Sequence, residues 1–382
     1  MSVPKLRFGE FCETWQKYRL GDVTKVYDGT HQTPKYVEKG IPFYSVEHVT
    51  ANQFDKTKFI SKQVFEKENK RVMLEKEDIL MTRIGSIGVA KFIDWDVNAS
   101  FYVSLALIKA NKEYNSLFFS HLIHSEGYQR ELWKKTIHVA FPKKINLGEL
   151  ANTFYYSPPS LTEQQKISSF LSSVDEKIQQ LTKKKSLLED YKKGVMQKIF
   201  SQELRFKDQN GNDYTDWEEK KLGDISKVYQ PKTISQTDLT EEGFVVYGAN
   251  GIIGRYHSYN HEFQQIAVTC RGNTCGTVNL TKKLSWITGN AMVINLDNSN
   301  DCDKKFMYFQ LSNTNLRYLI TGSGQPQITG DIKSHKIKKP VLEEQQKIAN
   351  FLSAIDEKIT LTNIQIDNTK AFKKGLLQQM FV

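Results

Sequence analysis

Residues 163–178 read EQQKISSFLSSVDEKI, and residues 344–359 read EQQKIANFLSAIDEKI. In both copies the apolar residues recur at steps of three and four, which is the period of an α-helix. The pattern extends over residues 160–200 and 341–382, so each helix would be roughly 60 Å long at ~1.5 Å per residue. An apolar stripe of that length does not stay in water, and the simplest partner for each helix is the other. The sequence therefore predicts an antiparallel coiled coil.

The ends of these helices carry further signals. Ser160 and Glu163 have the spacing of a capping box, in which each side chain bonds the backbone N–H of the other. Near the far end both copies read aromatic-Lys-Lys-Gly, with the glycines at Gly194 and Gly375. Because a mid-helix glycine costs about 1 kcal/mol relative to alanine, its recurrence indicates either a bend or close backbone approach, or a frayed last turn.

A second repeat opens each copy. Residues 15–27 read WQKYRLGDVTKVY, residues 217–229 read WEEKKLGDISKVY, and LRF precedes both. The opening segments lie 202 residues apart and the helix segments 181, so the first copy holds 21 more residues between similar edges. Two long repeats predict two equivalent structural units. We expect two bodies, each followed by a long helix, with the boundaries 1–158, 159–201, 202–340 and 341–382.

The closing residues complete this repeat. Phe381 aligns with Phe200, after which the next copy begins, so the chain is close to a closed ring of two units.

Both bodies show short strand-like runs separated by glycine-rich turns. The clearest runs are residues 41–46, 101–108, 265–269 and 291–295. The predicted fold class is therefore α/β in the mixed α+β sense. Two such globular bodies would be joined by the two long helices, with a pseudo-twofold repeat relating the copies.

The charge of the chain lies mainly in the bodies. The net charge is +10 and the pI is about 9.1. Lys outnumber acidic residues by eight to five over residues 160–200 and equal them over 341–382, so +7 belongs to the bodies. A basic body favours a polyanionic partner, and nucleic acid is the commonest. The four cysteines have no zinc-site spacing, so we expect reduced thiols in a cytoplasmic protein.

Motifs of catalytic chemistry are missing from the sequence. No Gly-Lys dipeptide occurs, which excludes a P-loop, and neither Gly-x-Gly-x-x-Gly nor Gly-x-Ser-x-Gly is present. The Asn-Pro-Pro-aromatic segment of base-amino methyltransferases is also absent. The pairs His121/His124 and His257/His261 have helical spacing, but surface or core histidines explain them better than metal ligands do. We predict a binding protein with no catalytic centre, no metal and no cofactor of its own.

Candidate DNA contacts lie on turn-like stretches of both bodies. Forked and amide side chains suit base edges, whereas Lys, Ser and Thr suit phosphates. In the first body these candidates are His31, Gln32, Lys35, Tyr36, His48, Arg83, Ser86, His138, Lys143 and Lys144. In the second they are Gln230, Lys232, Asn250, Arg255, Arg271, Asn273, Gln325 and Gln327. For each one alone, a solvated loop residue is the alternative interpretation.

A shorter internal repeat draws attention to two arginines. Residues 83–88 read RIGSIG and residues 271–276 read RGNTCG, which pairs Arg83 with Arg271. Recurrence in two otherwise different bodies favours a role at base edges or in supporting the loops that reach them. A structural arginine bound to a carboxylate is the alternative.

The order of these segments resembles the specificity subunit of type I restriction–modification systems. The shared pattern is a variable body, a Pro-x-Leu-x-Glu-Gln-Gln-Lys-Ile helix, a second body and a second such helix. The repeated openings resemble the start of that family's target recognition domains. GSGQPQI at 322–328 and, more loosely, FPKKI at 141–145 resemble its segment before the helix.

The resemblance implies a concrete function. Each body would read one half of a split, asymmetric DNA site, and the coiled coil would set the spacer between the halves. Two methyltransferase subunits would use S-adenosylmethionine to methylate adenine, and restriction subunits would use ATP. The rivals are an enzyme with unfamiliar motifs and a coiled-coil scaffold that binds protein alone, but a scaffold leaves the basic bodies unexplained.

Overall fold

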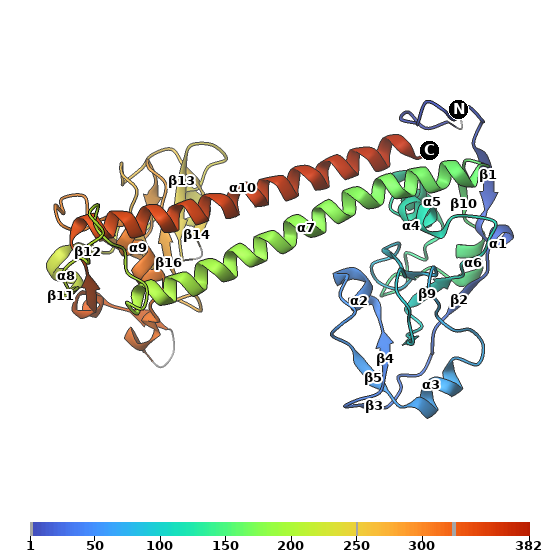
Figure 1. Ribbon diagram of the computed structural model, residues 1–382, viewed down its shortest axis with the longest axis horizontal. Helices are drawn as coiled ribbons and strands as arrows, with labels where there is room; N and C mark the ends of the chain where they lie inside the picture. Colours follow the sequence, from blue (N-terminus) through green and yellow to red (C-terminus); the bar gives the residue numbers. More distant parts are fainter. Residues whose placement is uncertain (1–2, 250, 323–325) are drawn as a thin grey trace. The chain divides into compact units, whose positions relative to one another are not determined.

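The computed structural model describes residues 3–249, 251–322 and 326–382. The chain forms two compact units: the first combines Met1–Leu181 with Gln365–Val382, and the second is Thr182–Ile364. Two long helices, α7 (Leu161–Phe200) and α10 (Leu342–Met380), each contribute one end to each unit (Figure 1). The two units divide within α7 and α10, between residues 181 and 182 and between 364 and 365. This division does not test the four predicted segments, which therefore stay a prediction.

Each unit is built on a four-stranded antiparallel sheet with the same strand order. In the first unit the order is β2-β9-β6-β7, and in the second it is β12-β18-β15-β16. In the first unit a second sheet and one two-stranded sheet accompany it, and in the second unit a second sheet and two two-stranded sheets do. These sheets, together with the helices, confirm the predicted mixed α/β class.

The strands of the first unit are β1 (Gln16–Arg19), β2 (Val26–Asp28), β3 (Tyr36–Val37), β4 (Ile41–Tyr44), β5 (Lys58–Ile60), β6 (Ile79–Thr82), β7 (Ala90–Phe92), β8 (Ser100–Phe101), β9 (Leu105–Ile108) and β10 (Phe154–Ser157). Its short helices are α1 (Leu20–Val23), α2 (Val46–Ala51), α3 (Lys62–Glu68), α4 (Ser116–Ile123), α5 (Glu126–Lys135) and α6 (Leu147–Ala151).

The strands of the second unit are β11 (Glu218–Lys221), β12 (Lys227–Tyr229), β13 (Phe244–Gly248), β14 (Gly251–Tyr256), β15 (Ile266–Thr269), β16 (Val278–Leu280), β17 (Trp286–Ile287), β18 (Ala291–Asn295), β19 (Ile320–Thr321), β20 (Gln327–Ile328) and β21 (Lys336–Lys339). Its short helices are α8 (Leu222–Ile225), α9 (Lys304–Ser312) and the 3₁₀ turns Gln236–Asp238, Leu316–Leu319 and Gly330–Ser334.

Two of the predicted strand runs differ from the structure. The run 41–46 forms β4 but gives way to α2, which begins at Val46. The run 101–108 divides into β8 and β9, because a turn closes where Leu105 N donates to Tyr102 O at 2.9 Å. The runs at 265–269 and 291–295 form β15 and β18.

In the first unit the start of α7 packs against the end of α10. Ile167 and Leu171 of α7 share a buried cluster with Leu376 and Met380 of α10. Beside this cluster, Lys373 Nζ lies 2.6 Å from an Asp175 oxygen.

In the second unit the two helices exchange roles. Met196 and Ile199 near the end of α7 pack with Ile348 and Leu352 near the start of α10, and Lys192 Nζ lies 2.6 Å from Asp356. The start of each helix therefore meets the end of the other, which confirms the antiparallel pairing. The two ion pairs are equivalent under the repeat. In the first unit the aspartate is on α7 and the lysine on α10, and in the second unit the reverse holds.

The two repeated motifs meet at a joint in each unit. Arg7 Nε and Nη2 both donate to the Glu163 carboxylate at 2.7 Å, and Arg205 Nη2 donates to Glu344 at 2.8 Å. The predicted capping box is therefore only half right. Glu163 N donates to Ser160 Oγ at 3.4 Å, but the Glu163 carboxylate turns to the guanidinium because that charge-assisted bond is stronger.

The glutamine after each of these glutamates ties the helix to its body. Gln164 Oε1 accepts from Asn115 N at 2.9 Å, just before α4. Gln345 Oε1 accepts from Asp303 N at 2.8 Å, just before α9. The same residue thus makes the same bond in both units.

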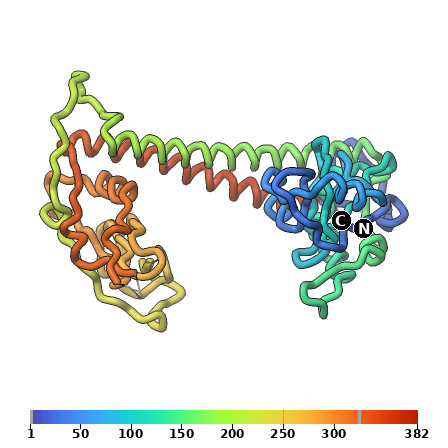
Figure 2. Tube along the Cα trace, turned by 90° about the horizontal axis from the view of Figure 1, so that it is seen from below, coloured from blue at the N-terminus to red at the C-terminus, as the bar shows by residue number. Residues whose placement is uncertain are grey.

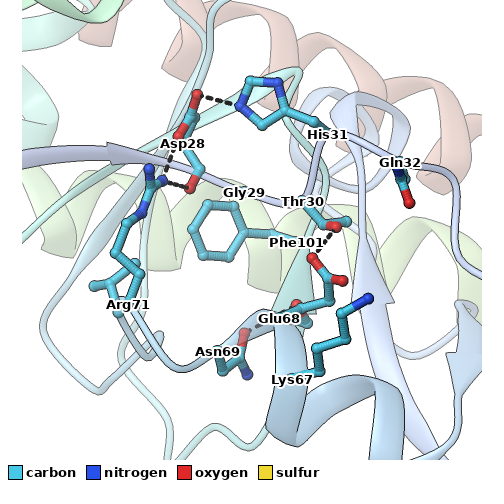
Figure 3. Close-up of a pocket in the computed structure, with 12 residues that line it drawn as sticks. Asp28, Gly29, Thr30, His31, Gln32, Lys67, Glu68, Asn69, Arg71 and Phe101 are labelled. Carbon is cyan, nitrogen blue, oxygen red and sulfur yellow. Dashed lines mark hydrogen bonds and ion pairs between the residues drawn. The ribbon is translucent and has the colours of Figure 1, made fainter.

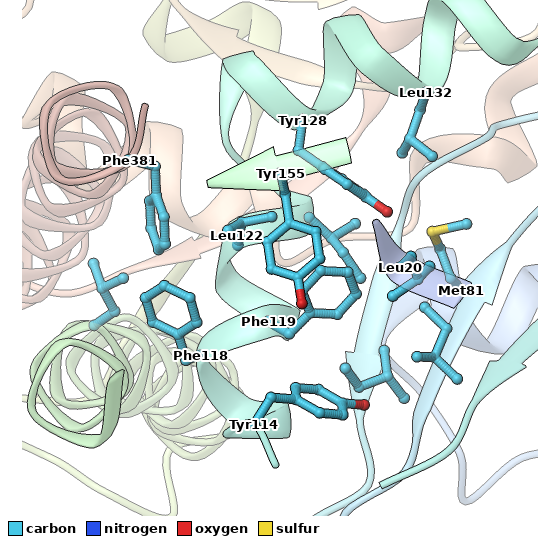
Figure 4. Packing of buried hydrophobic residues seen from close by; sticks show 14 of the residues in the cluster. Leu20, Met81, Tyr114, Phe118, Phe119, Leu122, Tyr128, Leu132, Tyr155 and Phe381 are labelled. Carbon is cyan, nitrogen blue, oxygen red and sulfur yellow. The ribbon is translucent and has the colours of Figure 1, made fainter. Parts of the chain in front are cut away.

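The aromatic residue that closes each long helix also makes the same contacts. Phe200 packs against Trp217 and Phe306, and Phe381 against Trp15 and Phe118. Figure 4 shows Phe381 beside Phe118 in the core of the first unit.

Leu6 lies beside the end of α10, although the two are far apart in the sequence. Its repeat equivalent, Leu204, lies in the same way beside the end of α7, which it follows closely in the chain. Leu6 N donates to Gln379 O at 2.9 Å, and Leu204 N donates to Lys198 O at 3.0 Å. Both termini therefore lie in the first unit (Figure 2), and the predicted ring of two units is confirmed.

The recurring glycines lie in unbroken helix. α7 continues past Gly194 to Phe200 and α10 past Gly375 to Met380, so a frayed turn does not explain them. A Cβ added at either glycine would meet nothing within 4 Å. The predicted close backbone approach is therefore wrong for the described chain, and both glycines border open space.

Candidate nucleic-acid interface

Most of the predicted contacts lie on loops that follow the carboxyl ends of two strands of the central sheet in each unit. These strand ends lie on the same side of the sheet, which we call an edge. β2 and β6 both run antiparallel to β9, so their carboxyl ends share an edge, and residues 29–35 and 83–89 follow them. β12 and β15 both run antiparallel to β18, so residues 230–235 and 270–277 share the corresponding edge.

A third loop joins the other two at this edge. In the first unit Ile145 N donates to Arg83 O at 3.0 Å, and Gly85 N donates to Lys143 O at 2.8 Å. In the second unit Ile328 N donates to Cys270 O at 3.0 Å, and Gly272 N donates to Pro326 O at 3.1 Å. We call the three loops of each unit its loop edge: residues 29–35, 83–89 and 137–145 in the first, and 230–235, 270–277, 320–322 and 326–328 in the second.

The structure brings most of the predicted DNA-contacting residues together on the loop edges. In the first unit these are His31, Gln32, Lys35, Arg83, Ser86, His138, Lys143 and Lys144, and in the second they are Gln230, Lys232, Arg271, Asn273 and Gln327. Tyr36, His48 and Arg255 instead belong to the second sheets or to α2 beside them. Asn250 and Gln325 lie outside the described residues.

The predicted pairing of Arg83 with Arg271 is out of register by one residue. Gly85 and Gly272 have matching φ angles of 82° and 81° and donate to equivalent loops. The backbone N–H of the buried isoleucine in the third loop donates to the Arg83 oxygen in the first unit (from Ile145) but to the Cys270 oxygen in the second (from Ile328). Arg271 therefore corresponds to Ile84, and the two arginines face different surroundings because successive side chains of extended backbone alternate.

Arg83 is buried inside the loop edge. Its guanidinium donates to Val103 O at 2.7 Å and to Ile145 O at 3.2 Å. Burial lowers the pKa of Arg83, against the opposing charge of Asp28. The side chain thus ties two loops through backbone oxygens, not through the carboxylate that the alternative interpretation required, which gives it a supporting role. Arg271 is exposed.

A polar hollow of about 370 Å³ opens beside the first loop edge (Figure 3). Asp28 lies in its wall, accepts from His31 Nε2 at 2.8 Å and forms an ion pair with Arg71. Burial alone would raise the pKa of Asp28, but the Arg71 and His31 hydrogen bonds outweigh burial and lower it. The hollow therefore combines a carboxylate with cationic and amide donors, as polar base edges require.

No pattern in the sequence selects Arg71, which lies just after the end of α3 and lines the hollow. It meets Asp28 across 43 positions of the chain. Lys67, Glu68 and Asn69 line the same hollow. No local pattern marks these residues, since they become neighbours of His31 and Gln32 only after folding.

A second hollow lies between the first loop edge and the second sheet. Thr33, Tyr36, His48 and Tyr102 are among the residues that line it. His48 is buried and its Nδ1 accepts from Ser45 N at 2.9 Å, so this ring holds the start of α2. Tyr36 is more open, and Lys58 Nζ lies 4.8 Å from its ring centroid.

The second loop edge presents a different set of side chains. Gln230 Nε2 donates to Gly289 O at 3.2 Å and to Cys270 Sγ at 3.1 Å, which braces the first loop against the second. Arg255 donates to Gly243 O at 2.7 Å on the second sheet. Lys232, Arg271 and Asn273 are exposed.

The other titratable clusters have structural partners. His121 is buried, with Nε2 3.1 Å from Ser172 Oγ, and burial lowers its pKa to about 4. His261 Nε2 lies 2.8 Å from the Tyr229 hydroxyl. Over residues 3–249, 251–322 and 326–382, no group of three His, Cys, Asp or Glu residues is placed to hold a metal ion. In the same part of the chain, each helix is too short or too polar to cross a membrane.

Known proteins share this arrangement. The family described as type I restriction modification DNA specificity domain matches residues 12–190 and 214–369. A protein of Methanocaldococcus jannaschii, described as the specificity subunit of type I restriction enzyme MjaX, is 25% identical over 402 residues, 98% of this chain and 94% of its own.

Two solved structures share the fold. The crystal structure of the S subunit of a type I restriction–modification system from M. genitalium gives a TM-score of 0.68 at 16% identity, over 100% of this chain and 99% of that chain. A structure concerned with complex assembly of the type I R-M system gives a TM-score of 0.56 at 14% identity, over 95% and 96%.

The family matches fall once on each repeat and together cover most of the chain. The duplicated loop edge and the paired helices are the structural form of that repeat. The chain belongs to the type I restriction–modification DNA specificity family, and it is a specificity subunit.

Proposed function

We propose that each loop edge reads one half of a split DNA site and that the subunit carries no chemistry of its own. The observation that supports this most directly is the duplicated loop edge. Two loops leave the same end of the central sheet in both units, and a third loop is joined to them by equivalent backbone bonds. The exposed side chains on them differ, so two equal frames present two different reading surfaces.

The exposed side chains of the loop edges divide by chemistry. Lys35, Lys143, Lys144 and Lys232 are exposed and suit phosphate oxygens, which position a protein on DNA without reading sequence. Gln32, Arg271 and Asn273 carry the amide and guanidinium groups that pair with adenine and guanine edges in the major groove. Arg83 and His48 would act by holding the loops in place.

The paired helices would set the spacing between the half-sites. Each unit fixes the start of one helix against the end of the other through an apolar cluster and a lysine–aspartate ion pair. Rigid helices of fixed length suit a spacer because their length is set by residue number.

Equivalent apolar patches on the helices support docking of two partner subunits. Tyr191 is 53% exposed and Phe372 is 55% exposed, at the same position of the two repeats. Three residues on, Gly194 and Gly375 border open space, and residues three apart share a helix face. We propose that one methyltransferase subunit docks on each patch, binds S-adenosylmethionine and methylates adenine, and that restriction subunits supply the ATP-dependent steps.

Methylation mapping of a host with and without this chain, each with its methyltransferase partner, tests the proposal. We expect methyladenine in both halves of one split motif, present only with the chain. Replacing residues 202–340 with the body of another specificity subunit should change one half of the motif. A change in both halves, or no motif in an active complex, would contradict independent reading by the two loop edges.

A matched insertion tests the spacer. Seven residues added to both α7 and α10 would lengthen the pair by about 10 Å, or roughly three base pairs. An unchanged spacer in the mapped motif would rule out this role for the helices.

A further inference from the structure

The third loop of the first unit carries exposed apolar side chains at its tip. Phe141 is 104% exposed and Val139 is 96% exposed. Trp133, at the end of α5 just before this loop, is 57% exposed. Single exposed apolar residues are common on protein surfaces, but three within nine positions, on α5 and the loop that follows it, are typical of a contact surface.

The base of this loop is held firmly. Ile137 N donates to Lys144 O at 2.8 Å and closes the loop as a hairpin. Gly85 N donates to Lys143 O at 2.8 Å, and Ile145 is fully buried. The loop edge thus presents the tip residues on an anchored stem, which reduces the entropy lost when they bind.

A lysine and a histidine ring lie against Trp133 at the base of the tip. Lys143 Nζ lies 4.7 Å from the Trp133 ring centroid, and the His138 ring lies 4.1 Å from the same ring. Lys143 and Lys144 are exposed. An apolar tip beside exposed lysines matches the surface of duplex DNA, where phosphates flank stacked bases. A protein partner would more often meet an apolar patch without this charge.

The corresponding segment of the second unit, GSGQP at 322–326, has no aromatic or branched aliphatic residue in its sequence. Thr321 pairs with Gln327 as Ile137 pairs with Lys144. Counted back from that stem in the sequence, Gly324 stands where Phe141 stands in the first unit, within the segment GSGQP. The apolar tip therefore belongs to one reading surface only.

We infer that Phe141 inserts between two neighbouring bases of the half-site read by the first unit, unstacks that step and bends the DNA there. Apolar side chains that enter base steps in this way kink the duplex, and lysines beside them hold the displaced phosphates. The half-site read by the second unit would stay stacked outside its target adenine. This inference rests on the proposed function, because it requires that the first loop edge contacts DNA.

The test uses the full chain with its methyltransferase partner and duplexes that contain the mapped site. 2-Aminopurine is placed at successive positions of both half-sites, because its fluorescence rises when a base loses its stacking neighbour. The methyltransferase turns its target adenine out of the stack in each half-site, so fluorescence should rise at both target positions whether or not Phe141 inserts. We expect one further rise, away from the target adenines, at one step of the half-site read by the first unit. Phe141→Ala should abolish this further rise and weaken binding about 10-fold, within the range for loss of one stacked aromatic, whereas Phe141→Trp should keep both.

The matched control is Phe263→Ala. Phe263 is 56% exposed and precedes β15, so it lies at the edge of the sheet opposite the loop edge. It should bind and unstack DNA like the unaltered chain.

The outcomes separate this inference from the proposed function. Site-specific binding with no fluorescence rise away from the target adenines, or such a rise that persists in Phe141→Ala, would overturn the wedge and leave half-site reading intact. Unchanged DNA binding with weaker methyltransferase association in Phe141→Ala would make the tip a protein contact. No site-specific binding by the unaltered complex would remove both.

Discussion

The two units make the same joint with different numbers of bonds. In the first, Glu163 accepts from Arg7 and also from Trp15 Nε1 at 3.2 Å. In the second, Glu344 accepts from Arg205, whereas Trp217 Nε1 is buried without a partner among the described residues. The arginine–glutamate pair is thus the part of the joint that both units keep. This pair is the shared element of the joint, whereas the hydrogen bond from the tryptophan is present, within the described parts of the chain, only in the first unit.

The bodies differ most in the stretch that lines the hollows beside the loop edge of the first unit. From Ile41 to Ile79 the first unit uses 38 positions between β4 and β6, and from Phe244 to Ile266 the second uses 22 between β13 and β15. The longer stretch forms α2, β5 and α3 and supplies much of both hollows. The difference in length therefore falls at the hollows beside the proposed contact surface and not at the joints.

The largest expected effect comes from breaking the joint. Glu163→Ala would leave the Arg7 guanidinium and the Trp15 N–H without their acceptor in a site where Glu163 is 1% exposed. We expect a loss of about 3–4 kcal/mol in the free energy of unfolding. Glu344→Ala should cost about 1 kcal/mol less, since one hydrogen bond fewer is lost. Urea unfolding followed by tryptophan fluorescence measures both.

Glu176 and Glu357 are the matched controls for this comparison. They occupy equivalent exposed positions on α7 and α10. Their alanine variants should stay within about 0.5 kcal/mol of the unaltered chain. Equal losses for Glu163→Ala and Glu344→Ala would show that the Trp15 bond adds nothing to the first joint.

The next effect distinguishes the units by pH. His121 lies six positions after the N-cap of α4, where α9 has Phe309. Burial first, and then the charge of Lys373, lowers the pKa of His121 to about 4, although Asp175 opposes them. Below the ordinary pKa of 6.5 the unfolded chain takes up a proton that the folded chain refuses. Stability is therefore complete above that pH and is lost as the pH falls toward 4, by about 2 kcal/mol at pH 5.

His121→Phe should remove most of that acid loss and make the first unit resemble the second. Free energies of unfolding at pH 7.5 and pH 5 measure the change. His124, and His261 and His335 of the second unit, whose pKa values burial also lowers, would account for the remaining slope. His257→Gln, at an exposed position of the second unit, is the control. An unchanged pH dependence in His121→Phe would mean that this ring does not set the acid stability.

The smallest stability effect compares two loop-edge arginines. Arg83→Met would leave Val103 O and Ile145 O without a donor, so we expect a loss of about 2 kcal/mol in the free energy of unfolding. Arg271→Met removes an exposed side chain and should change stability by less than about 0.5 kcal/mol. It should instead weaken binding to the mapped DNA about 10-fold. The reverse pattern would contradict the one-residue register between these loops.

Particular residues show how far the sequence predicted the fold. The helix period of the EQQKI segments and the alignment of Phe381 with Phe200 predicted the paired helices and the ring, and the structure confirms both. The predicted pairing of Arg83 with Arg271 was wrong by one position. The stretch from Gly272 to Gly276 is one residue longer than the equivalent stretch from Gly85 to Gly88, so aligning the second glycines shifts the arginines. Periodicity is read over tens of residues, whereas loop register depends on a single insertion.

The sequence by itself determined the duplication, the long helices and the absence of familiar catalytic motifs, since these depend on pattern along the chain. Tertiary structure alone decided which candidates share a surface. It brought Arg71 to Asp28, buried Arg83 and His48, and left Phe141 exposed beside Lys143. The physical reason is that backbone hydrogen bonds between distant loops set these positions, and no local propensity encodes which loops will meet.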